Sequence, residues 1–170
     1  MNALEMRYAL QLAGNIEAHV GELYESFADV APIPRDAQFW RLLSFEEKTH
    51  SQMMRLIQEH IPDDFHIDDA ELPRALRNNL EGLQKFNEFI LSLRQSAKEL
   101  AMDPFWQARL ASDLERSELD TVLEWLMQLK VSDDVRAIVQ EMTRGTTDHA
   151  ERVQKFGQEL ASRVPEIACL

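Results

Sequence analysis

Two glutamates and two histidines recur in this chain at nearly the same spacing. The string Leu-Ala-Gly-Asn-Ile-Glu ends at Glu17, and the similar string Leu-Ala-Ser-Asp-Leu-Glu ends at Glu115. His50 follows the first glutamate after 33 residues, and His149 follows the second after 34. A similar string and interval in each half indicate an internal repeat. Because carboxylate oxygens and imidazole nitrogens bind iron, manganese and zinc, the repeat predicts a metal site to which both halves contribute.

The first half also contains Glu47-Lys-Thr-His50, a Glu-x-x-His sequence. Residues three apart lie on the same face of a helix, so these two side chains can reach the same point. A single pair of this kind is a weak indicator, because glutamate and histidine meet at this spacing by chance on many helix surfaces. Its position within the repeat is what favours metal binding.

The residues that share a helical face with Glu17, His50, Glu115 and His149 are mostly apolar. Burying a carboxylate or an imidazolium among apolar side chains costs free energy unless the group is paired or bound to a metal. We therefore expect the four groups to meet inside the protein, where they form either a metal site or a buried polar network. The apolar neighbours are Leu10, Ala13, Val20 and Tyr24 beside Glu17; Leu43, Met53, Met54 and Ile57 beside His50; Ala108, Ala111, Leu119 and Val122 beside Glu115; and Met142, Val153 and Phe156 beside His149.

Long helices must position these residues. The chain has only five Gly and six Pro, and most of them lie between stretches whose apolar residues recur every three or four positions, such as Leu4, Tyr8 and Leu12. The fold class is therefore all-α. Helices of about 26 to 30 residues are about 40 to 45 Å long, too long to wrap round a small core, so they should lie side by side in a bundle. We predict helices over Asn2–Asp29, Arg35–His60, Arg74–Ala101 and Pro104–Lys130, and an acidic connector over Ile61–Pro73. A fifth helix is capped by the run Ser132-Asp133-Asp134 and ends near Arg163.

The predicted helices belong to one domain over residues 1–170. The first two make a helical hairpin over residues 2–60, and the last two make a second hairpin over residues 103–163. Residues 61–102 cross over between the hairpins and include an additional long helix. Each half of the repeat is thus one hairpin, in which the glutamate and the histidine lie at the same depth.

Three pairs of residues together carry a resemblance to a known family. They are Glu17 with Tyr24 seven residues later, Glu47 with His50, and Glu115 with Glu118. In these pairs the chain resembles the rubrerythrin-type di-iron carboxylate proteins of the ferritin-like superfamily. It lacks the Cys-x-x-Cys of a rubredoxin domain. The resemblance implies a ferritin-like four-helix bundle of two hairpins, here with the additional crossover helix.

The resemblance also implies a function. Such a protein would hold a di-iron centre, with manganese or zinc as other candidate metals. It would reduce peroxide or dioxygen with electrons from an external donor, and we expect a homodimer. The implied metal ligands are Glu17, Glu47, His50, Glu115, Glu118 and His149, with Tyr24 placed directly behind them.

Two features depart from the family pattern. Thr146 stands three residues before His149, where the family has a glutamate, so one bridging carboxylate is missing and Glu118 would have to restore its charge. The crossover helix is the second departure. If residues 74–101 formed the third helix of the bundle, Asn79 would face the core in place of a carboxylate. We rank that registry second, because it offers no inward carboxylate.

Composition excludes several classes of function. The formal net charge is −12, from 18 Lys and Arg against 30 Asp and Glu, and no basic cluster offsets it. A basic surface for nucleic acid or an anionic membrane is therefore excluded. The single cysteine, Cys169, excludes an internal disulfide. No stretch reaches the roughly 18 apolar residues of a membrane span, and the N-terminus has no signal-peptide pattern, so we expect a cytoplasmic protein.

Two other functions stay open on the sequence. A bundle that has lost catalysis would serve as a binding or structural module, with Thr146 as the mark of the lost site. Iron storage in a large ferritin-like shell is disfavoured, because the additional helix would change the outer surface through which subunits pack.

Overall fold

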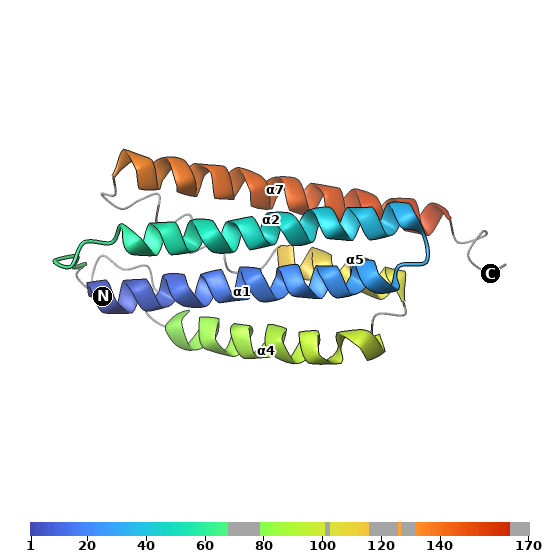
Figure 1. Cartoon of the computed structure of the whole chain (residues 1–170), viewed down its shortest axis with the longest axis horizontal. Helices are drawn as coiled ribbons and strands as arrows, with labels where there is room; N and C mark the ends of the chain where they lie inside the picture. The colour runs from blue at the N-terminus through green and yellow to red at the C-terminus, as the bar shows by residue number, and fades with distance from the viewer. Residues whose placement is uncertain (68–78, 101–102, 116–125, 127–131, 164–170) are drawn as a thin grey trace.

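The computed structural model has five helices in its described part, which confirms the all-α class (Figure 1). It describes residues 1–67, 79–100, 103–115, 126 and 132–163. Residues 74–78, 101, 116–125 and 127–130 of the predicted helices, together with Glu118 and Cys169, lie outside the described residues. The helices are α1 (Ala3–Val30), α2 (Pro34–Glu59), α4 (Asn79–Leu100), α5 (Pro104–Glu115) and α7 (Asp133–Ser162).

The helices start where their capping residues stand. The Asn2 side chain accepts a hydrogen bond from the Glu5 backbone, and the Glu5 carboxylate accepts one in return from the Asn2 backbone. This reciprocal capping makes Asn2 the cap of α1 and not its first helical residue. Pro34 occupies the first turn of α2, where its missing N–H costs nothing. Ser132 caps α7 through the Val135 backbone, as predicted.

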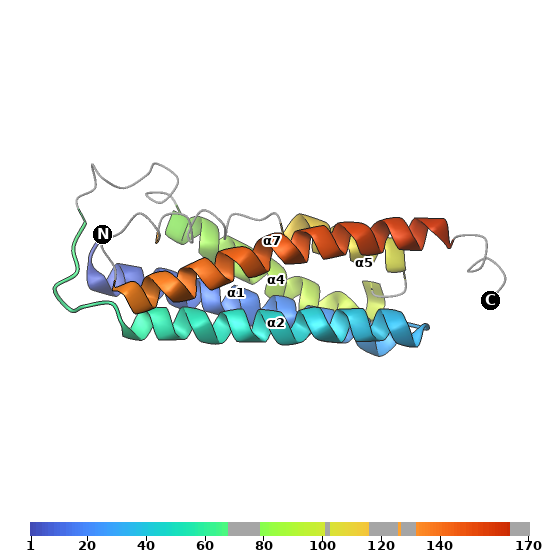
Figure 2. The same cartoon turned by 90° about the horizontal axis from the view of Figure 1, so that it is seen from above.

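The helices run side by side, and α1 and α2 form the central hairpin. This pair shares the most extensive contact among the helices of the described part. α4 packs along α1 on the side away from α2, as both views show (Figures 1 and 2). α5 packs against α7, and α7 also contacts α2. Residues from α1, α2, α5 and α7 can therefore meet between these four helices.

Two glycines let α1 and α2 approach closely. A Cβ atom built on Gly21 would lie 3.0 Å from the Ser44 carbonyl oxygen and 3.3 Å from the Glu47 Cβ. One built on Gly14 would lie 3.3 Å from the Met54 Cβ. The two helices thus leave little room for a side chain at either glycine, and Glu17 lies between these glycines in sequence.

The buried face of α1 differs from the predicted stripe at its start. Leu4 is 75% exposed and Tyr8 is 39% exposed, whereas Met6 and Leu10 are fully buried. Residues four apart differ by about 40° in direction around a helix. Leu4 and Leu12, two such steps apart, therefore do not point the same way, and Leu4 lies off the buried face. None of the described helices is long and apolar enough to span a membrane.

Candidate metal centre

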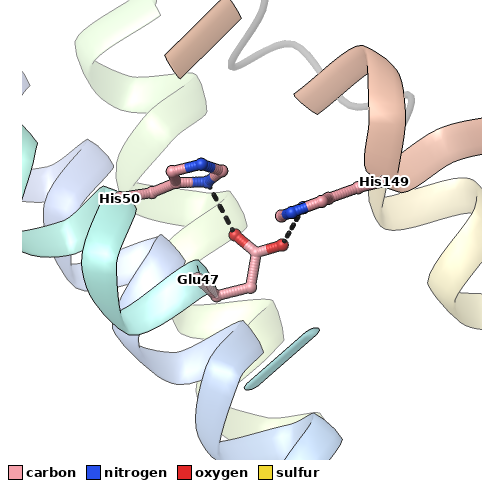
Figure 3. A group of neighbouring side chains, drawn as sticks. All are labelled: Glu47, His50 and His149. Atoms are coloured by element: carbon pink, nitrogen blue, oxygen red, sulfur yellow. Dashed lines mark hydrogen bonds and ion pairs between the residues drawn. The ribbon is translucent and has the colours of Figure 1, made fainter. Parts of the chain in front are cut away.

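Glu47 lies between two histidines in the interior of the bundle (Figure 3). Its Oε1 is 2.8 Å from Nδ1 of His149, and its Oε2 is 3.3 Å from Nδ1 of His50. The two imidazole rings stack with their centroids 5.0 Å apart. One ligand atom from each of the three residues lies within 4.8 Å of the others, and all three side chains are buried. This group could bind a metal ion.

Glu115 on α5 also belongs to the group. Its Oε2 is 3.6 Å from Nδ1 of His149, and its Oε1 accepts a hydrogen bond of 2.8 Å from the Tyr24 hydroxyl on α1. Glu17, also on α1, is 6% exposed and lies within hydrogen-bonding reach of Glu47. Three buried carboxylates and two buried imidazoles thus converge from four helices.

The electrostatics of the group follow from burial and from mutual pairing. Burial alone would lower the pKa of His149, but its hydrogen bonds with Glu115 and Glu47 outweigh burial and raise it to about 10. Burial alone would raise the pKa of Glu47, yet its hydrogen bonds with His149 and His50 bring it well below the usual range. Without metal, an imidazolium and a carboxylate therefore neutralise each other at neutral pH.

The pKa values of Glu115 and Tyr24 are raised, whereas that of Glu47 is lowered. Burial raises the pKa of Glu115, and the charge on Glu47 raises it further. Burial and the charge on Glu115 raise the pKa of Tyr24, so it stays a neutral hydrogen-bond donor. The carboxylates are crowded enough to repel one another, and a bound cation would relieve that repulsion.

Gly145 on α7 makes room for His50. A Cβ atom at this position would lie 2.6 Å from Nε2 of His50, closer than side-chain atoms approach one another. The imidazole therefore has its Nδ1 toward Glu47 and its Nε2 against the α7 backbone.

Two residues that the sequence reasoning missed contact His149 or its neighbourhood. Oε2 of Glu46 lies 3.1 Å from Nε2 of His149, and Arg152 pairs with both oxygens of Glu46. Arg152 shares a helix face with Asp148, and the sequence predicts that this face is exposed to solvent. Its partner Glu46 on α2 is 106 residues away in sequence. Such a long-range pair leaves no local sequence signal.

Five of the six predicted metal ligands lie in the described part of the structure, and these five meet. Glu17, Glu47, His50, Glu115 and His149 converge with Tyr24 in the buried group described above. Glu118 lies outside the described residues, and so does the side chain of Thr146, although Thr146 itself belongs to α7. The carboxylate of the third predicted ligand helix comes from α5, as the first-ranked registry requires.

A groove of about 380 Å³ leads from the surface to the two histidines. It runs between α2 and α7, and it is lined by both imidazoles, by Gly145 and by the Glu46–Arg152 pair, among others. The volume exceeds that of a water molecule about tenfold, so small molecules fit. A ligand entering here would meet the histidine side of the group first.

Comparisons with known proteins do not extend this description. No protein-family model, no curated protein and no solved structure matches the chain.

Proposed function

We propose that the chain is a metal-dependent oxidoreductase of the ferritin-like, rubrerythrin type, which reduces peroxide or dioxygen with electrons from a separate donor. The observation that supports this most is the buried group of Glu47, His50 and His149, because a carboxylate between two imidazoles deep in a helical bundle is costly to build without a ligand. Carboxylate and imidazole donors suit iron and manganese, and zinc also accepts them.

The donor set fits one divalent ion directly. Glu47, His50 and His149 supply an oxygen and two nitrogens whose positions already lie within 4.8 Å of one another. A second ion, as in a di-iron centre, would depend on Glu17 and Glu115. Bound iron would pass electrons from the separate donor to the oxidant.

The remaining residues have roles that follow from their contacts. Tyr24 donates to Glu115 and so holds one carboxylate oxygen in place. The groove between α2 and α7 admits the small oxidant, and Gly145 leaves room for the imidazole of His50. Because the sequence contains no Cys-x-x-Cys, we assign electron supply to another protein or reductant. We also propose a homodimer, which light scattering in solution would test.

Metal content is the first test. Protein purified without chelators and loaded with ferrous ion should hold at least one iron per chain, and Glu47→Gln should lose most of it. Glu151→Gln, an exposed residue on α7, removes the same charge away from the group and should leave the metal content unchanged. Less than about 0.3 metal per chain in the parent would overturn the proposal.

Turnover is the second test. The iron-loaded protein should consume hydrogen peroxide when a chemical reductant is present, and the rate should fall with the metal content of the variants. A parent that binds metal and shows no consumption would instead favour a binding or structural module. In that case the ion pair of Glu47 with His149 would be a buried polar network that stabilises the fold.

A further inference from the structure

His149 contacts a carboxylate on each side of its ring. Nδ1 faces Glu47 at 2.8 Å, inside the buried group, and Nε2 faces Glu46 at 3.1 Å, on the groove side. The two carboxylates are neighbours in sequence on α2, yet they approach opposite nitrogens of one imidazole from α7. His50 differs, because its Nε2 lies against the backbone at Gly145.

Arg152 holds Glu46 in this position. Nη1 and Nη2 of the guanidinium pair with the two oxygens of Glu46, at 3.3 and 2.5 Å. Such a two-pronged pair fixes both the place and the plane of a carboxylate. The side chains of Arg152 and Glu46 are 26% and 30% exposed, so the pair is partly shielded from solvent. The same arginine lies 2.9 Å from Asp148 through Nε, an ion pair without hydrogen-bond geometry.

A histidine that binds a metal through one nitrogen commonly donates its other N–H to a carboxylate. That contact fixes which nitrogen carries the proton and how the ring is turned. His149 has its nitrogens placed for this arrangement: Nδ1 is hydrogen-bonded with Glu47, and Nε2 forms an ion pair of 3.1 Å with Glu46. The carboxylate beside Nε2 comes from α2, the helix that also carries Glu47 and His50.

We propose that Glu46, anchored by Arg152, is the positioning residue of His149: it accepts the Nε2 proton and keeps Nδ1 directed at the metal. This inference rests on the proposed function, because it assumes that the group of Glu47, His50 and His149 binds metal. Glu46 itself is not a ligand in this proposal, since it contacts the nitrogen that points away from Glu47.

Zinc binding measured by competition with a chromophoric chelator tests the proposal. Loss of a carboxylate behind a metal-binding histidine lowers affinity by about 10- to 100-fold, and we expect that range for Glu46→Ala. Glu46→Gln keeps an acceptor oxygen and should lose less. Asp148→Asn is the matched control, because it removes a carboxylate from the same arginine without touching His149, and its affinity should stay within about twofold of the parent.

A second readout separates positioning from a general structural role. In the zinc-loaded protein, the Nε2 proton of His149 should give a slowly exchanging, downfield NMR signal. Glu46→Ala should lose this signal, Asp148→Asn should keep it, and Glu46→Gln should shift it. If circular dichroism shows that Glu46→Ala does not fold, Glu46→Gln and Arg152→Met replace it in both measurements. Arg152→Met should lower the zinc affinity by less than the roughly 10- to 100-fold expected for Glu46→Ala.

The outcomes distinguish the two proposals. A parent that binds no zinc, iron or manganese overturns the proposed function and this inference with it. A parent that binds zinc, with the Glu46 variants indistinguishable from Asp148→Asn in affinity and in the Nε2 signal, overturns this inference alone. Weaker binding in the Glu46 variants with the Nε2 signal intact would also contradict it, because His149 would then be oriented by another group.

Discussion

The Tyr24 hydroxyl on α1 donates a hydrogen bond of 2.8 Å to Glu115 on α5, and both groups are buried. The two bonded residues are 91 positions apart in sequence, and the bond joins their helices at the candidate metal centre. It gives one oxygen of Glu115 a fixed partner and leaves the other facing His149. Tyr24 thereby links the packing of the bundle to the geometry of the site.

Replacing Tyr24 with phenylalanine should therefore cost stability. The change leaves a buried carboxylate oxygen without its donor, which typically costs about 1 to 3 kcal/mol. Urea unfolding of the metal-free protein measures the loss. Tyr8→Phe is the matched control, because the Tyr8 hydroxyl accepts a hydrogen bond from Gln84 at a 39% exposed position and should change stability by less than about 0.5 kcal/mol. Equal effects of the two variants would contradict this role of Tyr24.

Two glycines of α7 should respond oppositely to alanine. Gly145→Ala places a Cβ atom 2.6 Å from Nε2 of His50, so the imidazole must move, and we expect iron or zinc affinity to fall by about 10-fold or more. Gly157→Ala meets only the Ala108 Cβ, at an ordinary 3.7 Å, and should stabilise the helix by about 0.5 to 1 kcal/mol with metal affinity unchanged. Metal titration and thermal unfolding of both variants check this pair. Unchanged affinity in Gly145→Ala would place the metal away from His50.

The metal-free protein should lose stability as the pH rises toward 10. The pKa of His149 is raised from an ordinary 6.5 to about 10, where hydrogen bonds with Glu115 and Glu47 outweigh burial. A raised pKa means that the folded state holds the proton more tightly, so its stabilisation is complete below about pH 6.5 and disappears as the pH passes 10. His149→Gln should flatten this part of the stability profile measured by urea unfolding. His60→Gln, an exposed change, should leave the profile as in the parent.

Metal binding should release the proton that His149, with its raised pKa, retains in the metal-free protein. A divalent ion must displace the proton that His149 holds in the metal-free state, so binding at pH 8 should release about one proton from this residue. Titration calorimetry in two buffers with different ionisation enthalpies measures the release. His149→Gln should release about one proton fewer, and equal release would mean that the ion does not contact this imidazole.

The sequence was sufficient for the class of fold and for most of the buried group. Helical periodicity and the cap at Ser132 locate the starts of α1, α2, α5 and α7 to within a residue or two, although Asn2 was expected inside the helix that it caps. The repeat finds Glu17, His50, Glu115 and His149, because polar residues on apolar faces have few structural reasons to be there. These signals are local, and each can be read within one helix.

The features that the sequence could not supply all depend on contacts between helices. Glu46 looks like any surface glutamate until α7 places Nε2 of His149 beside it. The role of Gly145 is equally invisible, since it depends on the imidazole of another helix. Leu4 was misplaced for another reason: steps of four residues drift around α1, and the buried face at its start includes Ala3 and Met6 instead.

The last prediction concerns Thr146, which stands where the resembled family has a glutamate. Val139, Met142 and Val153 share its predicted helical face, and all three are buried. Thr146→Glu would therefore rebuild a Glu-x-x-His sequence with His149 on an inward face. In the metal-free protein, one more unpaired buried carboxylate should destabilise the fold by a few kcal/mol, about 2 to 4.

With ferrous or manganous ion the sign of the effect should reverse. An anionic oxygen replaces a neutral hydroxyl beside a cation, so the variant should bind a second ion more tightly than the parent. Thermal unfolding with and without metal shows both effects in one experiment. Thr143→Glu, an exposed position one turn earlier, is the control and should shift neither curve appreciably. If Thr146→Glu unfolds no lower than the parent without metal and gains no extra stability with it, position 146 does not face the site, and the assignment of a missing carboxylate there is wrong.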